Sequence, residues 1–147
     1  MATVQNFEDL KVWQKSRILC NEIFDLITID KFSKDFALVN QINKSSGSIM
    51  DNVAEGFGRM GNKEFINFLS YTYGSALECK SQLYRALDRK YISKEKSEEL
   101  FNLIEEIKKM TNALITYLGH SALKGQKFKA RDNKERVQNS VSSQTKN

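Results

Sequence analysis

The sequence contains no proline, and its apolar residues recur at alternating spacings of three and four along most of the chain. This spacing places apolar side chains on one face of an α-helix. Ordinary composition would give a chain of 147 residues about seven prolines. Because proline interrupts helices, its absence leaves long helices uninterrupted. The length suits one globular unit, so the pattern predicts an all-α protein and argues against turn-rich β folds.

Four helices are expected, separated by short breaks in the periodicity. Ser33, Asn62 and Ser93 are candidate N-caps, because a side-chain oxygen there can accept a hydrogen bond from an unpaired backbone N–H. Gly119 is a candidate C-terminal stop. Helices of this length with short connections are typical of an antiparallel up-down-up-down four-helix bundle. The expected helices cover residues 6–29, 33–57, 62–90 and 93–119.

The third expected helix carries the clearest buried seam. Its spacing of four and three is typical of a helix packed nearly parallel to its neighbours. Cys79 lies on this seam, and neither it nor Cys20 has the spacing of a zinc site, so both are expected to be buried, reduced thiols. The seam consists of Phe65, Leu69, Thr72, Ala76, Cys79, Leu83 and Ala86.

The charge divides the chain into two parts. Residues 1–119 hold 16 basic and 16 acidic side chains, whereas residues 120–147 hold 7 basic and 2 acidic ones. The net charge of +5 therefore belongs to the tail. We predict a four-helix bundle over 1–119 and a basic polar tail over 120–147. The tail has little apolar content, so we expect disorder or a partner-dependent conformation there.

Several classes of function are disfavoured. No apolar run is long enough to span a membrane, and no secretory signal is recognisable, so we expect a cytoplasmic protein. A di-metal site in a bundle needs Glu-x-x-His pairs, but His120 is the only histidine and lacks such a partner. No nucleophile, phosphate-binding or zinc motif occurs. We therefore expect no enzyme activity, no metal and no cofactor.

Two polar stripes lie beside the apolar seams of the middle helices. Both follow helical spacing over about five turns, and small Ser, Asn and Gln side chains replace much of the Lys and Glu of an ordinary exposed face. They are either solvent-exposed rows or packed contacts between helices or subunits. Gly47 favours contact, because glycine is costly inside a helix unless another backbone comes close. The stripes are Gln41, Ser45, Ser48, Asn52, Glu55 and Arg59, and Tyr71, Ser75, Glu78, Gln82, Arg85 and Arg89.

Six segments carry a family resemblance, which covers about residues 7–118. The chain resembles the four-helix bundle proteins encoded in intervening sequences of 23S rRNA, a family similar to the accessory variability determinant proteins of bacterial diversity-generating retroelements. The resemblance implies a homopentamer without enzyme activity that associates with nucleic acid. The segments are Phe7-x-x-Leu10-x-Val12-Trp13-Gln14, Gln41-Ile42, Ser48-Ile49-x-x-Asn52-Val53-Ala54-Glu55-Gly56-x-Gly58-Arg59, Phe65-x-x-Phe68-Leu69, Gly74-Ser75-x-x-Glu78-x-x-x-Gln82-Leu83 and Lys90-Tyr91-Ile92.

Two functions remain open at this point. The first is non-specific binding of RNA or DNA, because an oligomer would multiply the effect of each basic patch. The second is a protein-interaction scaffold or an accessory subunit for a reverse transcriptase. Candidate nucleic-acid-binding residues are Lys44, Arg59, Lys63, Arg85, Arg89 and Lys90 on the bundle, with Lys127, Lys129 and Arg131 in the tail.

Overall fold

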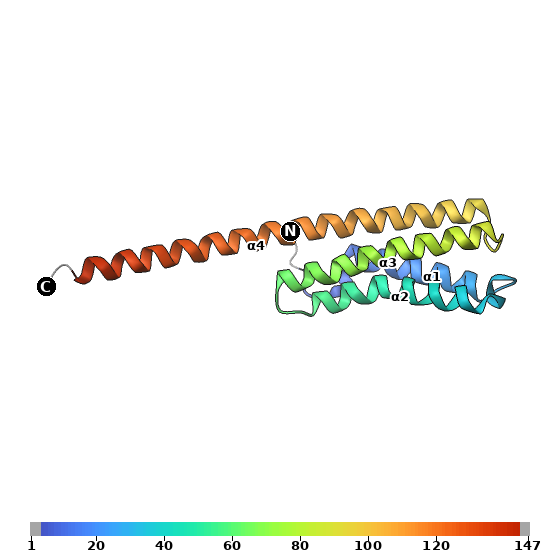
Figure 1. The fold of residues 1–147 in the computed structure, drawn as a ribbon, viewed down its shortest axis with the longest axis horizontal. Coiled ribbons are helices and arrows are strands. Elements are labelled where there is room, and N and C mark those ends of the chain that lie inside the picture. The colour runs from blue at the N-terminus through green and yellow to red at the C-terminus, as the bar shows by residue number, and fades with distance from the viewer. Residues whose placement is uncertain (1–3, 145–147) are drawn as a thin grey trace.

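A computed structural model describes the backbone of residues 4–144 and the side chains of residues 4–121. The described chain is all-α and contains no strand, which confirms the predicted fold class. Successive long helices reverse direction along the bundle and are joined by short turns (Figure 1). The elements are the 3-10 turn η1 (Phe7–Asp9), α1 (Lys11–Ile27), the 3-10 turn η2 (Phe32–Lys34), α2 (Phe36–Phe57), α3 (Asn62–Asp88) and α4 (Lys94–Gln144).

The helix starts agree with the sequence in one of three cases. Ser93 caps α4, since its Oγ accepts a hydrogen bond from the backbone N–H of Lys96 at 3.1 Å. The expected cap at Ser33 is wrong, because this residue lies inside η2 and its hydroxyl donates to the Asp30 carbonyl. Asp35 caps α2 instead. Asn62 is the first residue of α3 rather than its cap.

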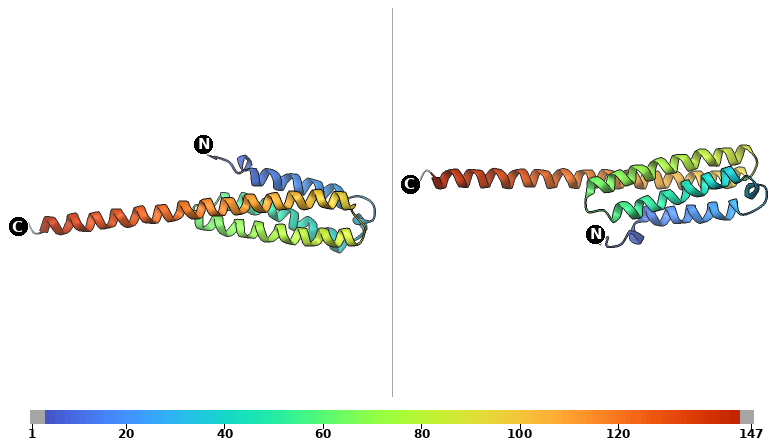
Figure 2. Two further views of the ribbon diagram at one scale, coloured as in Figure 1. Left: turned by 90° about the horizontal axis from the view of Figure 1, so that it is seen from above. Right: turned by 60° about the horizontal axis from the view of Figure 1, so that its bottom comes forward.

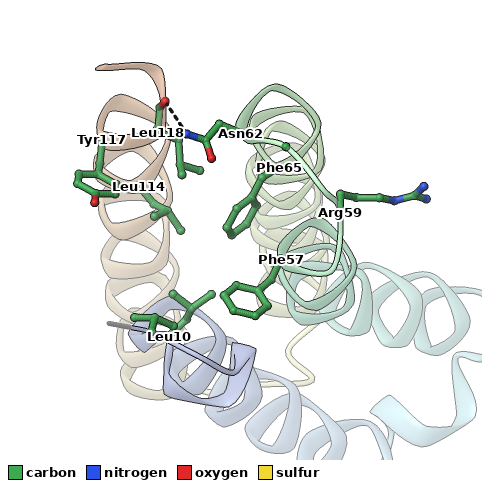
Figure 3. Close-up of a pocket in the computed structure, with 10 residues that line it drawn as sticks. Leu10, Phe57, Arg59, Asn62, Phe65, Leu114, Tyr117 and Leu118 are labelled. Atoms are coloured by element: carbon green, nitrogen blue, oxygen red, sulfur yellow. Dashed lines mark hydrogen bonds between the residues drawn. The ribbon is translucent and has the colours of Figure 1, made fainter. Parts of the chain in front are cut away.

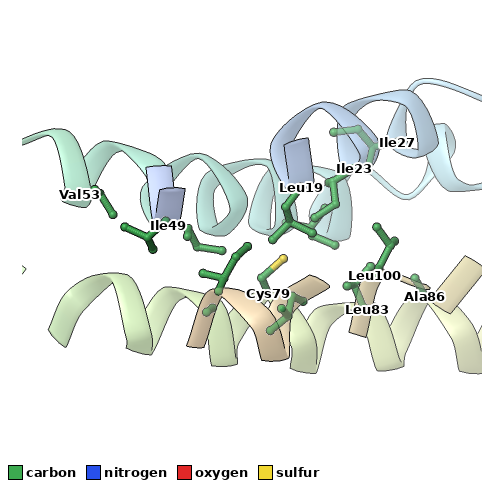
Figure 4. Packing of buried hydrophobic residues seen from close by; sticks show 14 of the residues in the cluster. Leu19, Ile23, Ile27, Ile49, Val53, Cys79, Leu83, Ala86 and Leu100 are labelled. Atoms are coloured by element: carbon green, nitrogen blue, oxygen red, sulfur yellow. The ribbon is translucent and has the colours of Figure 1, made fainter. Parts of the chain in front are cut away.

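All four helices contribute to one apolar core. The seven seam residues of α3 are all buried, as predicted. Leu19 and Ile23 of α1, Ile49 of α2 and Leu100 of α4 pack into the same cluster (Figure 4). Helices α2 and α3 follow one another in the sequence and pack side by side. Polar side chains at the edge of their contact can therefore reach across from one helix to the other.

Helix α4 does not stop at Gly119. It continues to Gln144 and projects past the end of the other three helices, as all views show (Figures 1 and 2). No glycine in the described chain has a positive φ, so Gly119 lacks the left-handed conformation of a helix-ending glycine. The predicted stop is therefore wrong, and the expected tail begins as a continuation of α4. The part of α4 beyond the bundle has few apolar residues, so packing contributes little to its stability. A bound partner could therefore stabilise it.

Candidate interface along α2 and α3

The two polar stripes face each other across α2 and α3. Ser45 Oγ donates a hydrogen bond to Gln82 Oε1 at 2.6 Å, and Ser75 Oγ donates to Ser48 Oγ at 3.0 Å. At one end, Arg85 Nη2 donates to Gln41 Oε1 at 2.5 Å. We call these three pairs the α2–α3 polar seam. The sequence left contact and exposure open, and for these six residues the structure shows contact within one chain.

Burial changes along this seam. Ser45 is 2% exposed and Gln82 is 4% exposed, whereas Gln41 is exposed. Thr72 adds a further buried link, since its Oγ1 donates to the Ile49 carbonyl at 3.1 Å. No buried side-chain nitrogen or oxygen of the described residues lacks a hydrogen-bond partner. The seam therefore fixes the register of α2 against α3, because shifting either helix would leave buried polar atoms unpaired.

The remaining stripe residues lie nearer the solvent. Asn52 Nδ2 donates to Ser48 along α2, and Glu78 accepts from Gln82 along α3. Glu55 is exposed and forms an ion pair with Arg59 at 3.0 Å, while Tyr71 is 59% exposed. Each stripe therefore combines a packed part with an exposed part. Gly47 shows no close approach within the described chain, because a Cβ there would meet nothing within 4 Å.

Of the three candidate arginines on the bundle, two form ion pairs and one is hydrogen-bonded to a neutral side chain. Arg59 pairs with Glu55 and lies over the Phe68 ring, with its guanidinium carbon 5.0 Å from the ring centroid. Arg85 donates to Gln41 as part of the polar seam, and Arg89 pairs with Asp35 at 2.8 Å. Each guanidinium is therefore already engaged by a side chain of its own chain, although its remaining N–H groups can donate to another acceptor.

The candidate lysines differ from these arginines. Lys44, Lys63 and Lys90 are exposed and form no ion pair with the side chains that the structure describes. They lie on different elements and do not form one cluster. The tail candidates Lys127, Lys129 and Arg131 lie outside the residues whose side chains are described.

Asp35 is a site that the sequence reasoning missed. Its Oδ1 accepts from the backbone N–H of Leu38 at 3.3 Å, and its Oδ2 accepts from Tyr91 Oη at 2.9 Å and Arg89 Nη1 at 2.8 Å. The hydrogen bond from Tyr91, with help from Arg89, lowers the pKa of Asp35. An Asp directly before an apolar helical run is an N-cap signal that could have identified it.

An apolar pocket opens at the end of the bundle where α4 leaves the other helices. Its volume is about 590 Å³, and Phe57, Phe65 and Leu114 point toward it, whereas Arg59 points away (Figure 3). Asn62 Nδ2 donates to the Leu118 carbonyl at its edge at 3.5 Å. The pocket holds no reactive constellation, and no group of three metal-binding side chains occurs among the described residues. Nor does the described chain contain a helix both long and apolar enough to cross a bilayer.

These features define a class: a four-helix-bundle protein whose two central helices are joined by a buried polar seam. The family model described as 23S rRNA-intervening sequence protein matches residues 8–113, and the chain belongs to this family. The chain is also similar to a crystal structure of a protein with unknown function from the S23 ribosomal protein family of Bacteroides thetaiotaomicron. The two share 27% identity with a TM-score of 0.65, over 71% of this chain and 97% of the other. A comparison with curated proteins finds no match.

Proposed function

We propose that this protein is a non-enzymatic, cytoplasmic homo-oligomer that binds RNA or DNA without sequence preference, mainly through the C-terminal extension of α4. The observation that carries the proposal is the location of charge. The whole net charge of +5 lies in residues 120–147, and the backbone of this segment continues α4 beyond the bundle as far as Gln144. A basic arm held away from an electrically neutral body suits contact with a phosphate backbone.

The bundle offers less support for phosphate binding. Arg59 and Arg89 are neutralised by neighbouring carboxylates, and Arg85 is held by Gln41. The exposed lysines of the bundle are scattered, so they can add to binding without forming a patch of their own. Sequence-tolerant binding follows, because backbone contacts carry no base information.

Self-association would raise the nucleic-acid affinity of a C-terminal extension that binds weakly on its own. The family resemblance favours a homopentamer, in which five arms could contact one strand together. Linked binding sites raise the overall affinity through their effective concentration. We therefore expect affinity to depend on protein assembly as well as on salt.

The test uses the full chain with three charges removed from the arm. The Lys127→Gln, Lys129→Gln and Arg131→Gln triple variant should bind a single-stranded RNA of 20 nucleotides more weakly. The slope of log affinity against log salt should fall by about one for each lost phosphate contact. The matched control removes three lysines from the opposite end of the bundle, through Lys31→Gln, Lys34→Gln and Lys94→Gln. Equal slopes for the two triple variants would refute a role for the arm.

The alternative is a protein-interaction scaffold, such as an accessory subunit for a reverse transcriptase. The open apolar pocket beside Phe57, Phe65 and Leu114 favours this alternative, because it could receive an apolar side chain of a partner. A reverse-transcriptase gene with a template repeat beside this gene would support the alternative, whereas a location inside an rRNA gene would support the first proposal.

A further inference from the structure

The solvent-facing side of α3 carries a second regular row, distinct from the α2–α3 polar seam. Its residues follow spacings of four and three over the length of the helix, and all of them are exposed. Leu77 and Tyr84 are the large apolar members, with 43% and 48% of their surface exposed, and one face of the Tyr84 ring is stacked on Phe101 of α4. We call this set the outer row of α3. It consists of Lys63, Asn67, Ser70, Gly74, Leu77, Ser81, Tyr84 and Asp88.

Gly74 lies in the middle of this row, and neither its backbone conformation nor its neighbours within the chain explain why the residue is glycine. Its φ is not positive, so its backbone conformation does not require glycine. A Cβ added there would meet nothing within 4 Å, so no described neighbour requires glycine either. Glycine is unfavourable inside a helix, and no contact within the described chain explains its presence at Gly74, as is also true of Gly47. The result is a notch next to the exposed Leu77.

The outer row is complementary to its own reversed copy. An antiparallel pair with a two-fold axis between positions 75 and 76 would place Gly74 opposite Leu77, so that each leucine fills a notch. The same arrangement would place Ser70 opposite Ser81 and Asn67 opposite Tyr84. At both ends Lys63 would face Asp88. We propose that two copies of this chain pair through the outer rows of their α3 helices in this antiparallel register.

The charges of the row support a second copy as the partner. Lys63 and Asp88 have no ion-pair partner among the side chains that the structure describes. They are 25 residues apart on one helix, which is about 38 Å, so they cannot pair within one chain. A parallel pair would bring like charges together, whereas the antiparallel pair joins opposite charges twice.

The middle of the row resembles the centre of an interface. Between Lys63 and Asp88 the row itself holds no charged residue, and the nearest exposed charge to its centre along α3 is Glu78, beside Leu77. The outward face of α4 differs, because it carries exposed charges such as Glu98, Glu99 and Lys109. Charge depletion at the centre with charged groups at the rim is typical of protein–protein contacts.

This pairing goes beyond the proposed function and does not depend on nucleic acid. A two-fold contact uses the same surface on both copies, whereas a ring uses two different surfaces. Pairing through α3 would therefore form a dimer by itself or join two rings. Removal of the C-terminal extension should leave the pairing through α3 unchanged.

Charge exchange tests the proposed register. Lys63→Asp and Asp88→Lys alone would each create two like-charge contacts, so self-association should weaken by about tenfold at low salt. The double variant restores both opposite-charge contacts and should recover the parent association constant, measured by sedimentation equilibrium. Lys109→Asp on α4 is the matched control and should have no effect. A double variant that associates no better than the single variants would overturn the proposal.

Cysteine pairing gives a second test that does not depend on charge. A chain with Ser70→Cys mixed with a chain with Ser81→Cys should form a disulfide-linked dimer containing one copy of each. Either chain alone should not, because identical positions would lie about 16 Å apart along the helix axis. The half-buried Cys20 is present in every sample and reports the background. Equal cross-linking in all three samples, or none in the mixture, would overturn the pairing.

Discussion

The hydroxyl of Ser45 on α2 donates a 2.6 Å hydrogen bond to Oε1 of Gln82 on α3, and both side chains are buried. If a buried acceptor loses its donor, its desolvation free energy is no longer offset by a hydrogen bond, and the folded state is destabilised. We therefore expect Ser45→Ala to lower the free energy of unfolding by about 1–3 kcal/mol. Gln82→Met should remove the abandoned acceptor, so the double variant should be more stable than the sum of the single changes predicts. Urea unfolding of the four proteins measures this coupling, and strictly additive effects would contradict it.

Gly56 and Gly47 provide a matched pair on one helix. A Cβ at Gly56 would lie 2.6 Å from the Phe68 Cβ and 3.0 Å from Phe65 Cδ1, whereas a Cβ at Gly47 would meet nothing within 4 Å. Gly56→Ala should destabilise the fold by about 1–3 kcal/mol through overpacking. Gly47→Ala should stabilise it by about 0.5–1 kcal/mol through helix propensity. Thermal unfolding decides the signs, and a stabilising Gly56→Ala would show that the turn after α2 can shift.

Glu105 predicts a dependence of stability on pH. Its carboxylate accepts from Lys80 Nζ at 2.9 Å and Lys108 Nζ at 3.0 Å, and these contacts lower its pKa from 4.5 to about 2. Since the folded-state pKa lies below the unfolded-state value, the stabilising contribution is present above pH 4.5 and is lost as the pH falls toward 2. Glu105→Gln should therefore lower the urea midpoint at pH 7 but have little effect near pH 2.

The control for this prediction is Glu98→Gln. Glu98 is exposed on the same helix and forms no ion pair with the described side chains. Its replacement should change the midpoint little at either pH. A difference between Glu105→Gln and the parent protein that stays constant down to pH 2 would show that the lysine contacts do not contribute as ion pairs.

The two cysteines should differ in reactivity. Burial raises the pKa of the Cys79 thiol to about 12, so its reactive thiolate is scarce at neutral pH. Cys20 is only partly buried. Iodoacetamide at pH 8 should modify Cys20 in the folded protein and Cys79 only in urea, as followed by peptide mass spectrometry. Rapid modification of Cys79 without denaturant would indicate local opening of α3.

The fold was readable from the sequence because periodicity and burial agree. Thr72 and Cys79 occupied seam positions between larger apolar residues, and both are buried. Ser45 and Gln82 were recognisable as members of polar stripes, because small amide and hydroxyl side chains replaced charged ones. The hydrogen bond between them could not be predicted, because two stripes with the same spacing can be aligned in several registers. Only the packing of the core selects one of these registers.

The errors concern helix ends and have local physical causes. Ser33 and Asp35 are both residues that favour the N-cap position, and they lie two positions apart. Because Ser33 lies within the 3-10 turn η2, α2 begins after Asp35, which is its N-cap. Gly119 indicates a stop only if its backbone turns left-handed, which no periodicity reveals. The contacts of Asp35 with Arg89 and Tyr91 join residues more than 50 positions apart, so only the assembled bundle brings them together.

Helix α4 has one consequence for ligand binding. Its 51 residues correspond to a rod of about 76 Å without a hinge glycine in left-handed geometry. Leu100 and Ile107 anchor the near half of that rod in the core. A ligand bound to the far half therefore contacts the same helix whose near half forms part of the hydrophobic core.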